Sequence, residues 1–130
     1  MSRRAYSFVV AATAVCLLPA AAHAACVAPG FNTSGKFCNG CRYEGSMTTS
    51  RDEVCERPYR GQAATGPIME VIGHRLVQRA KHGIAGISGT TMAYSPSKGY
   101  AGTDEFVVEV DYRQGTDKGK FYVHWSVTVQ

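Results

Sequence analysis

Two stretches near the C-terminus alternate apolar residues with polar or mixed positions. Every even-numbered residue from Phe106 to Tyr112 is apolar, and so is every odd-numbered residue from Phe121 to Val129. Successive side chains of a β-strand point to opposite faces, so each stretch predicts a strand with one face in a core. Residues 113–120 separate the two strands and contain two glycines, which favours a hairpin loop.

Shorter apolar segments precede this hairpin. Ile84 and Ile87 stand before a Ser-Gly turn, and Met92 and Tyr94 follow it. Short strands at regular spacing, separated by Gly, Pro and Asp turns, are typical of an antiparallel sandwich. The pattern therefore predicts an all-β protein built on a single antiparallel β-sandwich.

Residues 68–82 fit two different structures. As a helix, the segment would start at a proline and carry Ile68, Ile72 and Leu76 on one face. As a strand, the same three residues share a face, and Gly73 marks a bulge or a break. Local signals favour the helix, whereas the strands that follow favour a strand. We predict the strand and keep the helix as the alternative.

The N-terminal segment, residues 25–61, has few long apolar runs and many turn residues. Asn39-Gly40 is the strongest short hairpin signal in it. Extended structure is expected at 46–50 and 54–59, with a charged turn between them. The segment therefore predicts a turn-rich region that precedes the sandwich.

Cysteines are confined to the N-terminal part of the chain. Four of the five cysteines remain if residues 1–24 are a cleaved leader, described below. An even number of cysteines in an exported protein predicts two disulfides, which stabilise the fold by about 2–4 kcal/mol each. Three pairings are possible, and the sequence leaves the choice open. The C-x-x-C spacing also fits a redox dithiol or half of a zinc site, but no helix pattern or second ligand pair accompanies it. The predicted disulfide cysteines are Cys26, Cys38, Cys41 and Cys55; the fifth, Cys16, lies in the leader.

The first 24 residues have the features of a bacterial signal peptide. Arg3 and Arg4 precede an apolar run, residues 8–22, and Ala22-His23-Ala24 fits a signal-peptidase site. The run is too short for a comfortable bilayer span, so we predict no transmembrane anchor. The arginine pair fits either general secretion or twin-arginine export. The expected location is periplasmic or secreted.

Cleavage after residue 24 leaves 106 of the 130 residues, enough for one small domain. We expect the cysteine-rich segment, 25–61, and the sandwich core, 62–130, to form one folded unit. The formal charge falls from +4 to +2 when the two leader arginines are removed, and the remaining charges are interspersed. Without a basic block, nucleic acid is a poor candidate for a partner.

A corner rich in Gly and Pro links two of the predicted strands within residues 92–110. Pro96 has no N–H for a sheet ladder, so it should end the strand before it. Gly99 and Gly102 permit backbone conformations that other residues avoid. Asp104 can accept backbone N–H bonds in an Asx-type turn before the next strand. The predicted structural corner comprises Tyr94, Pro96, Gly99, Gly102, Asp104 and Phe106, of which the two aromatic residues should enter the core.

These residues form a wider pattern with the segment 81–87 and the closing V-x-V strand. The pattern resembles that of bacterial immunoglobulin-like and cadherin-like domains, over about 77–129. The resemblance implies an immunoglobulin-like β-sandwich that serves adhesion, assembly or spacing, usually without catalysis. This copy stands alone behind a cysteine-bearing segment. The acidic motifs of calcium-binding cadherins are absent, so the resemblance implies no calcium.

The sequence contains no pattern that indicates catalysis. The histidines outside the leader, His74, His82 and His124, have no carboxylate or thiol at a suggestive spacing. Serine-hydrolase, zinc-protease and phosphate-loop motifs are absent. The acidic residues of 105–111 are expected on a solvated strand face. We therefore predict that the protein is no enzyme and has no catalytic residue, metal or cofactor.

Together these features predict an exported, non-enzymatic structural or protein-interaction module of the cell envelope. Its expected partner is another envelope or extracellular protein, and Tyr59, Tyr100 and Tyr122 are candidates for a contact patch. One alternative is a thiol-disulfide redox or metal-binding protein that uses Cys38 and Cys41. Another is a small secreted inhibitor or ligand-binding protein. The oligomeric state stays open.

Overall fold

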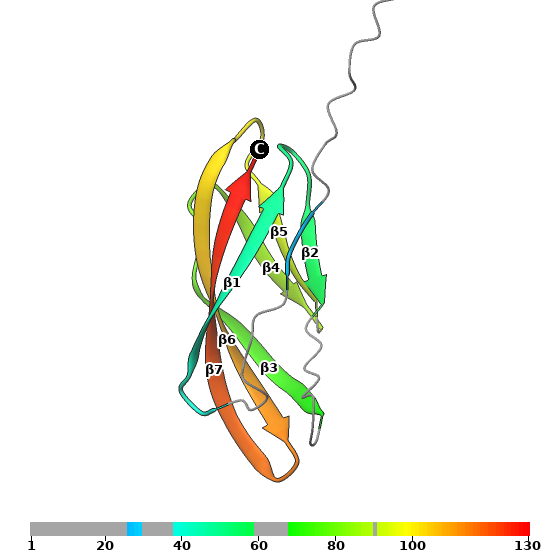
Figure 1. The fold of residues 1–130 in the computed structure, drawn as a ribbon, viewed down its shortest axis with the longest axis vertical. Helices are drawn as coiled ribbons and strands as arrows, with labels where there is room; N and C mark the ends of the chain where they lie inside the picture. Colours follow the sequence, from blue (N-terminus) through cyan, green and yellow to red (C-terminus); the bar gives the residue numbers. More distant parts are fainter. Residues whose placement is uncertain (1–25, 30–37, 59–67, 90) are drawn as a thin grey trace, which may run out of the picture.

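The computed structural model describes residues 26–29, 38–58, 68–89 and 91–130. Within these residues the chain forms seven strands and no helix (Figure 1). The all-β prediction is confirmed. The strands are β1 (Arg42–Thr49), β2 (Cys55–Pro58), β3 (Met69–Gln78), β4 (Gly83–Ser88), β5 (Thr91–Pro96), β6 (Gly102–Gln114) and β7 (Asp117–Val129).

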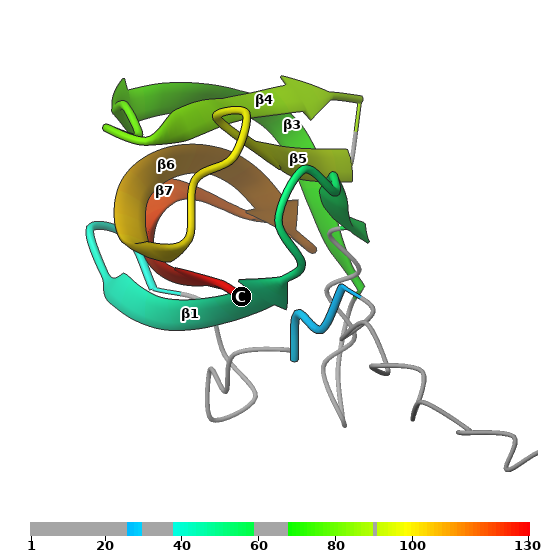
Figure 2. The ribbon, with the colours of Figure 1, turned by 90° about the horizontal axis from the view of Figure 1, so that it is seen from above.

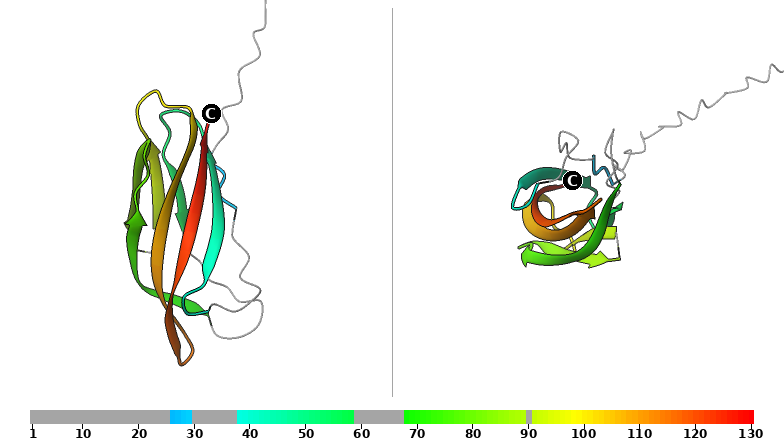
Figure 3. Two further views of the ribbon diagram at one scale, coloured as in Figure 1. Left: turned by 90° about the vertical axis from the view of Figure 1, so that its left-hand side faces the viewer. Right: turned by 90° about the horizontal axis from the view of Figure 1, so that it is seen from below.

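The strands form two sheets that enclose the core. One sheet has the order β1-β7-β6-β3, and the other has the order β2-β5-β4. Viewed from the end, the four-stranded sheet curls around the core and the other sheet closes its open side (Figure 2). The edge-on view in Figure 3 shows β4 and β5 on one side and β7 and β1 on the other.

The pairing of β1 with β7 departs from the predicted antiparallel arrangement. Every other pair of neighbouring strands is antiparallel, whereas these two are parallel over eight residue pairs, from Arg42 beside Tyr122 to Thr49 beside Val129. Parallel neighbours need a long connection between them. Here all the other strands provide it, because β1 and β7 are the first and last strands.

The hairpin of β6 and β7 is longer than the sequence pattern indicated. Gln114 pairs with Asp117, so only Gly115 and Thr116 form the turn. Gly115 has a φ of 63°, and a glycine at the first central position is typical of a tight hairpin turn. The loop predicted over 113–120 is therefore wrong. The strands continue there without apolar alternation because this end of the hairpin projects beyond the three-stranded sheet (Figure 1).

The ambiguous segment 68–82 forms strand β3, and the helix alternative is excluded. Its pairing with β6 shifts register twice, once around Ile72 and once around Val77. Each shift inserts an unpaired residue, and both of these residues are exposed. These bulges explain why the apolar alternation of β3 is interrupted.

Strands β1 and β2, from the cysteine-rich segment, lie in different sheets. β1 joins the four-stranded sheet and β2 joins the three-stranded sheet, so residues 25–61 and 62–130 share both sheets. The charged turn between β1 and β2 has Asp52 in a left-handed conformation, with φ 63°. The Asn39-Gly40 turn is present before β1, and the strand expected on its other side lies outside the described residues.

Aromatic side chains fill part of the core. Trp125, Phe106 and Tyr94 are fully buried, and their rings stack in a row with centroid separations of 6.0 and 6.4 Å. Gly45 of β1 covers the indole of Trp125, and a Cβ at this position would lie 2.6 Å from the ring. The alternation of β6 and β7 therefore directs their side chains as the sequence predicted.

Candidate functional site

The structure contains the two predicted disulfides and fixes their pairing. Cys26 is bonded to Cys55, with 4.9 Å between their Cα atoms. Cys55 is buried on β2, while Val27, next to Cys26, exchanges two backbone hydrogen bonds with Thr48 of β1. This disulfide therefore ties the edge of one sheet to the edge of the other.

The second disulfide joins Cys38 to Cys41 and closes the turn before β1. Two hydrogen bonds hold this turn against the β6–β7 hairpin. Gly40 donates its N–H to the carbonyl of Lys120, and the side-chain oxygen of Asn39 accepts the N–H of Lys120. The same C-x-x-C pair was the basis of the redox and zinc alternatives. In the described part of the chain, no three side chains of His, Cys, Asp or Glu are placed so that they could hold one metal ion together.

The predicted corner residues surround the connection from β5 to β6, which crosses from one sheet to the other. Gly99 has a φ of 74° and Gly102 a φ of 139°, a region that side-chain-bearing residues rarely adopt. A Cβ on Gly102 would lie 2.9 Å from the hydroxyl of Tyr100, which donates a hydrogen bond to the Thr103 carbonyl. The buried members of the corner are Tyr94, Pro96, Asp104 and Phe106.

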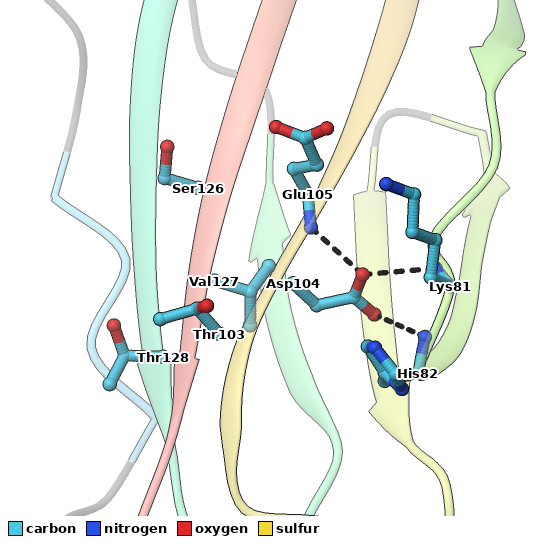
Figure 4. A pocket seen from close by; sticks show the side chains of 8 residues that line it. All are labelled: Lys81, His82, Thr103, Asp104, Glu105, Ser126, Val127 and Thr128. Carbon is cyan, nitrogen blue, oxygen red and sulfur yellow. Dashed lines mark hydrogen bonds between the residues drawn. The ribbon is translucent and has the colours of Figure 1, made fainter.

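Asp104 is the most connected of these residues. Its carboxylate accepts the backbone N–H groups of Lys81, His82 and Glu105 at 2.8–2.9 Å (Figure 4). It also accepts the hydroxyl of Tyr94 at 2.9 Å. Burial raises the pKa of Asp104, but the bonds from these donors outweigh it and hold the pKa below its usual value. Burial, and then the hydrogen bond to Asp104, raise the pKa of the Tyr94 hydroxyl. Asp104 therefore fastens the β3–β4 connection to β6. The prediction covered only a local Asx-type turn and did not include these bonds to a distant segment.

A histidine and two carboxylates meet on the outer face of the four-stranded sheet. Nδ1 of His124 on β7 lies 2.8 Å from Glu44 of β1, and Nε2 lies 3.2 Å from Glu105 of β6. The hydrogen bond with Glu44 is the main cause that raises the pKa of His124. Glu44 stands directly beside His124 in the parallel pairing. The cluster was not predicted from the sequence, because its residues are far apart in the chain and only the strand register brings them together.

A second ionic cluster lies further along the same face. Glu109 was expected to be solvated, but its side chain is only 7% exposed. Arg75 and Lys120 contact its carboxylate at 3.2 and 3.1 Å, and the hydrogen bond from Lys120 is the main cause that lowers its pKa. The expectation was wrong because two long cationic side chains cover Glu109. Both clusters connect neighbouring strands.

A shallow depression of about 400 Å³ lies beside Asp104 (Figure 4). The Asp104 carboxylate points towards the backbone of Lys81 and His82, and Glu105 bonds to His124. The depression therefore offers mainly hydroxyl groups and the ammonium of Lys81 to a ligand. Its lining residues are Lys81, His82, Thr103, Asp104, Glu105, Ser126, Val127 and Thr128.

The tyrosines proposed as a contact patch are separated. Tyr100 stacks on His82, with 4.4 Å between ring centroids, close to the start of β6. Tyr122 lies beneath the guanidinium of Arg42, at the start of β1 and near the middle of β7. Thr103, which bonds to Tyr100, pairs with Thr128, so the two tyrosines are about 20 Å apart along β7. They do not share one patch, and Tyr59 lies outside the described residues.

Two further findings concern the chain as a whole. Within the described residues, no helix has the length and apolar character needed to cross a bilayer. Comparison of the chain with protein-family models, curated proteins and solved structures found no match. The resemblance to immunoglobulin-like and cadherin-like domains therefore stays a prediction.

Proposed function

We propose that this protein is an exported, non-enzymatic structural or interaction module of the cell envelope, periplasmic or secreted. The observation that carries the proposal is how its ionisable side chains are used. The side chain of Asp104 bonds to the β3–β4 connection, and those of His124 and Glu109 bond to neighbouring strands, so all three have partners within the fold. The two disulfides support an oxidising compartment. Such a protein acts through its surface.

The strand order supports an immunoglobulin-like sandwich as the framework. In that fold the second, fifth and fourth strands share a sheet, and the seventh, sixth and third strands share the other. The orders β2-β5-β4 and β7-β6-β3 have the same arrangement. Two features differ from antibody domains: Trp125 lies on the last strand, and the disulfide of β2 reaches Cys26 rather than the sixth strand.

Thiol-disulfide exchange is the second candidate, because Cys38 and Cys41 are bonded to each other and Cys38 is exposed. In redox dithiols a helix N-terminus commonly stabilises one thiolate, and the described residues form no helix. The pair lies instead in a turn that is bonded to the β6–β7 hairpin. We therefore place this candidate second.

Intact-mass measurement of protein isolated from its own cells separates the two candidates. For the structural module we expect no alkylation before reduction and four alkyl groups after it. The Cys38→Ala/Cys41→Ala double variant should keep its fold and its binding partner. Two free, fast-alkylating thiols in the native protein, together with loss of disulfide exchange in the double variant, would establish the redox function instead.

Fractionation and capture test the location and the surface role. Cell fractionation should place the processed chain in the periplasm or the medium. Chemical crosslinking in intact cells, followed by capture, should recover one partner in a fixed ratio. A chain that stays unprocessed in the cytoplasm, or one that crosslinks to no protein, would contradict the proposal.

A further inference from the structure

The sheet edges differ in how they are protected against pairing with another strand. Four described strands, β1, β3, β2 and β4, lie at sheet edges. β3 is interrupted by bulges at Ile72 and Val77, and the short β2 ends in Pro58. β1 is bridged by Val27 at Thr48 and carries charged residues. Bulges, prolines, short length and charges are the usual means of blocking an edge.

β4 has none of these protections. It contains no charged residue and no proline, and its pairing with β5 is unbroken. Ser88 pairs with Thr91, and only two residues separate them in the sequence, so we take them as a hydrogen-bonded pair. The alternation along β4 then leaves the N–H groups of Ala85 and Ile87 on the free side. Ile84, beside them on the outer face, is 76% exposed. The edge therefore offers backbone donors and an apolar contact.

Positive charge gathers at one end of β4. Arg79 and Lys81 come shortly before the strand, and Lys98 follows Pro96, the residue that pairs with Gly83 at that end. All three cations are exposed, and none has an ion-pair partner among the residues that the structure places. The nearby carboxylates have other partners: Asp104 and Asp52 accept backbone N–H groups, and Glu105 bonds to Gln78 and His124. The other end of β4, at Ser88, is uncharged.

We propose that the free edge of β4 binds an extended, uncharged strand of a partner protein in antiparallel orientation, with acidic residues directly after that strand. Backbone hydrogen bonds to an exposed edge are an established mode of peptide recognition. An antiparallel partner brings its C-terminal end to the start of β4, where its carboxylates meet Lys81 and Arg79. A second copy of this chain would place the uncharged Ser88 end there and leave the cations unmatched.

Isotope-labelled mature protein and two synthetic peptides test this site. Both peptides consist of five alternating Thr and Val residues, followed by two Asp in one and two Lys in the other. The acidic peptide should shift the amide signals of Ala85 and Ile87 and slow their hydrogen exchange. It should bind about tenfold more tightly than the basic peptide, with the difference shrinking at high salt.

Variants separate the backbone contribution from the charge contribution. Ala85→Pro removes one free donor and should weaken binding about tenfold, whereas Ala85→Ser keeps the donor and should bind like the wild type. Lys81→Glu should reverse the preference between the two peptides. Lys118→Glu makes the same charge change at the β6–β7 turn and should leave the preference unchanged. If Ala85→Pro fails to fold, hydrogen exchange at Ala85 and Ile87 still tests the backbone contacts, and Lys81→Glu still tests the charge preference.

Three results would overturn the inference. They are equal binding of the two peptides, amide shifts centred on β1 or β3, and an absence of shifts at millimolar peptide. Protection of the β4 amides by self-association, without peptide, would assign the edge to a second copy instead. The inference rests on the proposed function, but different results would disprove the edge site and the function. A crosslinked partner that Ala85→Pro still captures would disprove the edge site alone, whereas the absence of any partner would disprove the function.

Discussion

Replacing Asp104 by alanine should be among the most destabilising changes on the β6 strand. The substitution leaves the buried Tyr94 hydroxyl without its acceptor, which costs about 1–3 kcal/mol. It also removes the acceptor of the Lys81 and His82 N–H groups, at about 1 kcal/mol each, because water can partly replace it at these exposed residues. We expect a total loss of about 3–5 kcal/mol.

Urea unfolding of the wild type and Asp104→Ala at pH 7 measures this loss directly. Tyr94→Phe, alone and combined with Asp104→Ala, isolates the hydroxyl contribution. Removing the hydroxyl should cost less in the Asp104→Ala background than in the wild type, because its partner is already gone. A loss below about 1 kcal/mol would refute the argument that Asp104 fastens β6 to the β3–β4 connection, and additive effects of the two substitutions would refute the coupling between Asp104 and Tyr94.

The same residue should make stability depend on acid. Burial raises the pKa of Asp104, but the hydrogen bonds together lower it by more, so the folded-state pKa lies below the ordinary value. The contribution is therefore complete above the unfolded-state pKa, about 3.9, and is lost as the pH falls through the folded-state value. The difference between the wild type and Asp104→Ala should shrink towards pH 2. A difference that is constant from pH 7 to pH 2 would contradict this assignment.

Three other predictions follow from the geometry. Cys26→Ala/Cys55→Ala opens a loop with a sequence separation of 29 and should cost about 3.5 kcal/mol relative to the oxidised wild type, measured by thermal melting. Removing the short C-x-x-C loop should cost about half as much. His124→Gln should lower stability by about 0.5–1 kcal/mol below pH 6.5 and have little effect at pH 9. The reason is that the folded-state pKa of His124 is raised, so its contribution to stability fades as the pH rises; equal losses at both pH values would exclude the ion pairs. Gly102→Val should cost about 2–4 kcal/mol by chemical denaturation, because the φ of 139° is unfavourable and the new Cβ approaches Tyr100; wild-type stability would show that the corner relaxes freely.

The strands with a clear period of two could be predicted from the sequence. Phe106 and Trp125 face the core because alternation is a local property that each strand carries by itself. The cysteine count likewise predicted two disulfides without any knowledge of the fold. The break in β3 was visible at Gly73, although it comes from two bulges rather than a division of the strand.

Contacts between distant strands could not be predicted in this way. Glu44 meets His124 only because β1 runs parallel to β7 in one register, and a shift by one residue would turn Glu44 to the other face. The donors of Asp104 come from Lys81 and His82, in a connection that no local turn pattern associates with it. Register and sheet order depend on the packing of the whole chain, so the candidate surfaces appear only in the folded structure.

The parallel pairing of β1 and β7 also determines how the sandwich carries mechanical load. Arg42 begins β1 at one end of the pair, and Val129 finishes β7 at the other end. A pull applied at Arg42 and at Val129 would slide the two strands along each other. Eight paired positions would then bear the force together, in shear, instead of opening one after another. The Cys26–Cys55 bond would carry a pull from the N-terminal side past β1 to β2, so the shear resistance of β1 and β7 applies to forces that enter at the turn before β1.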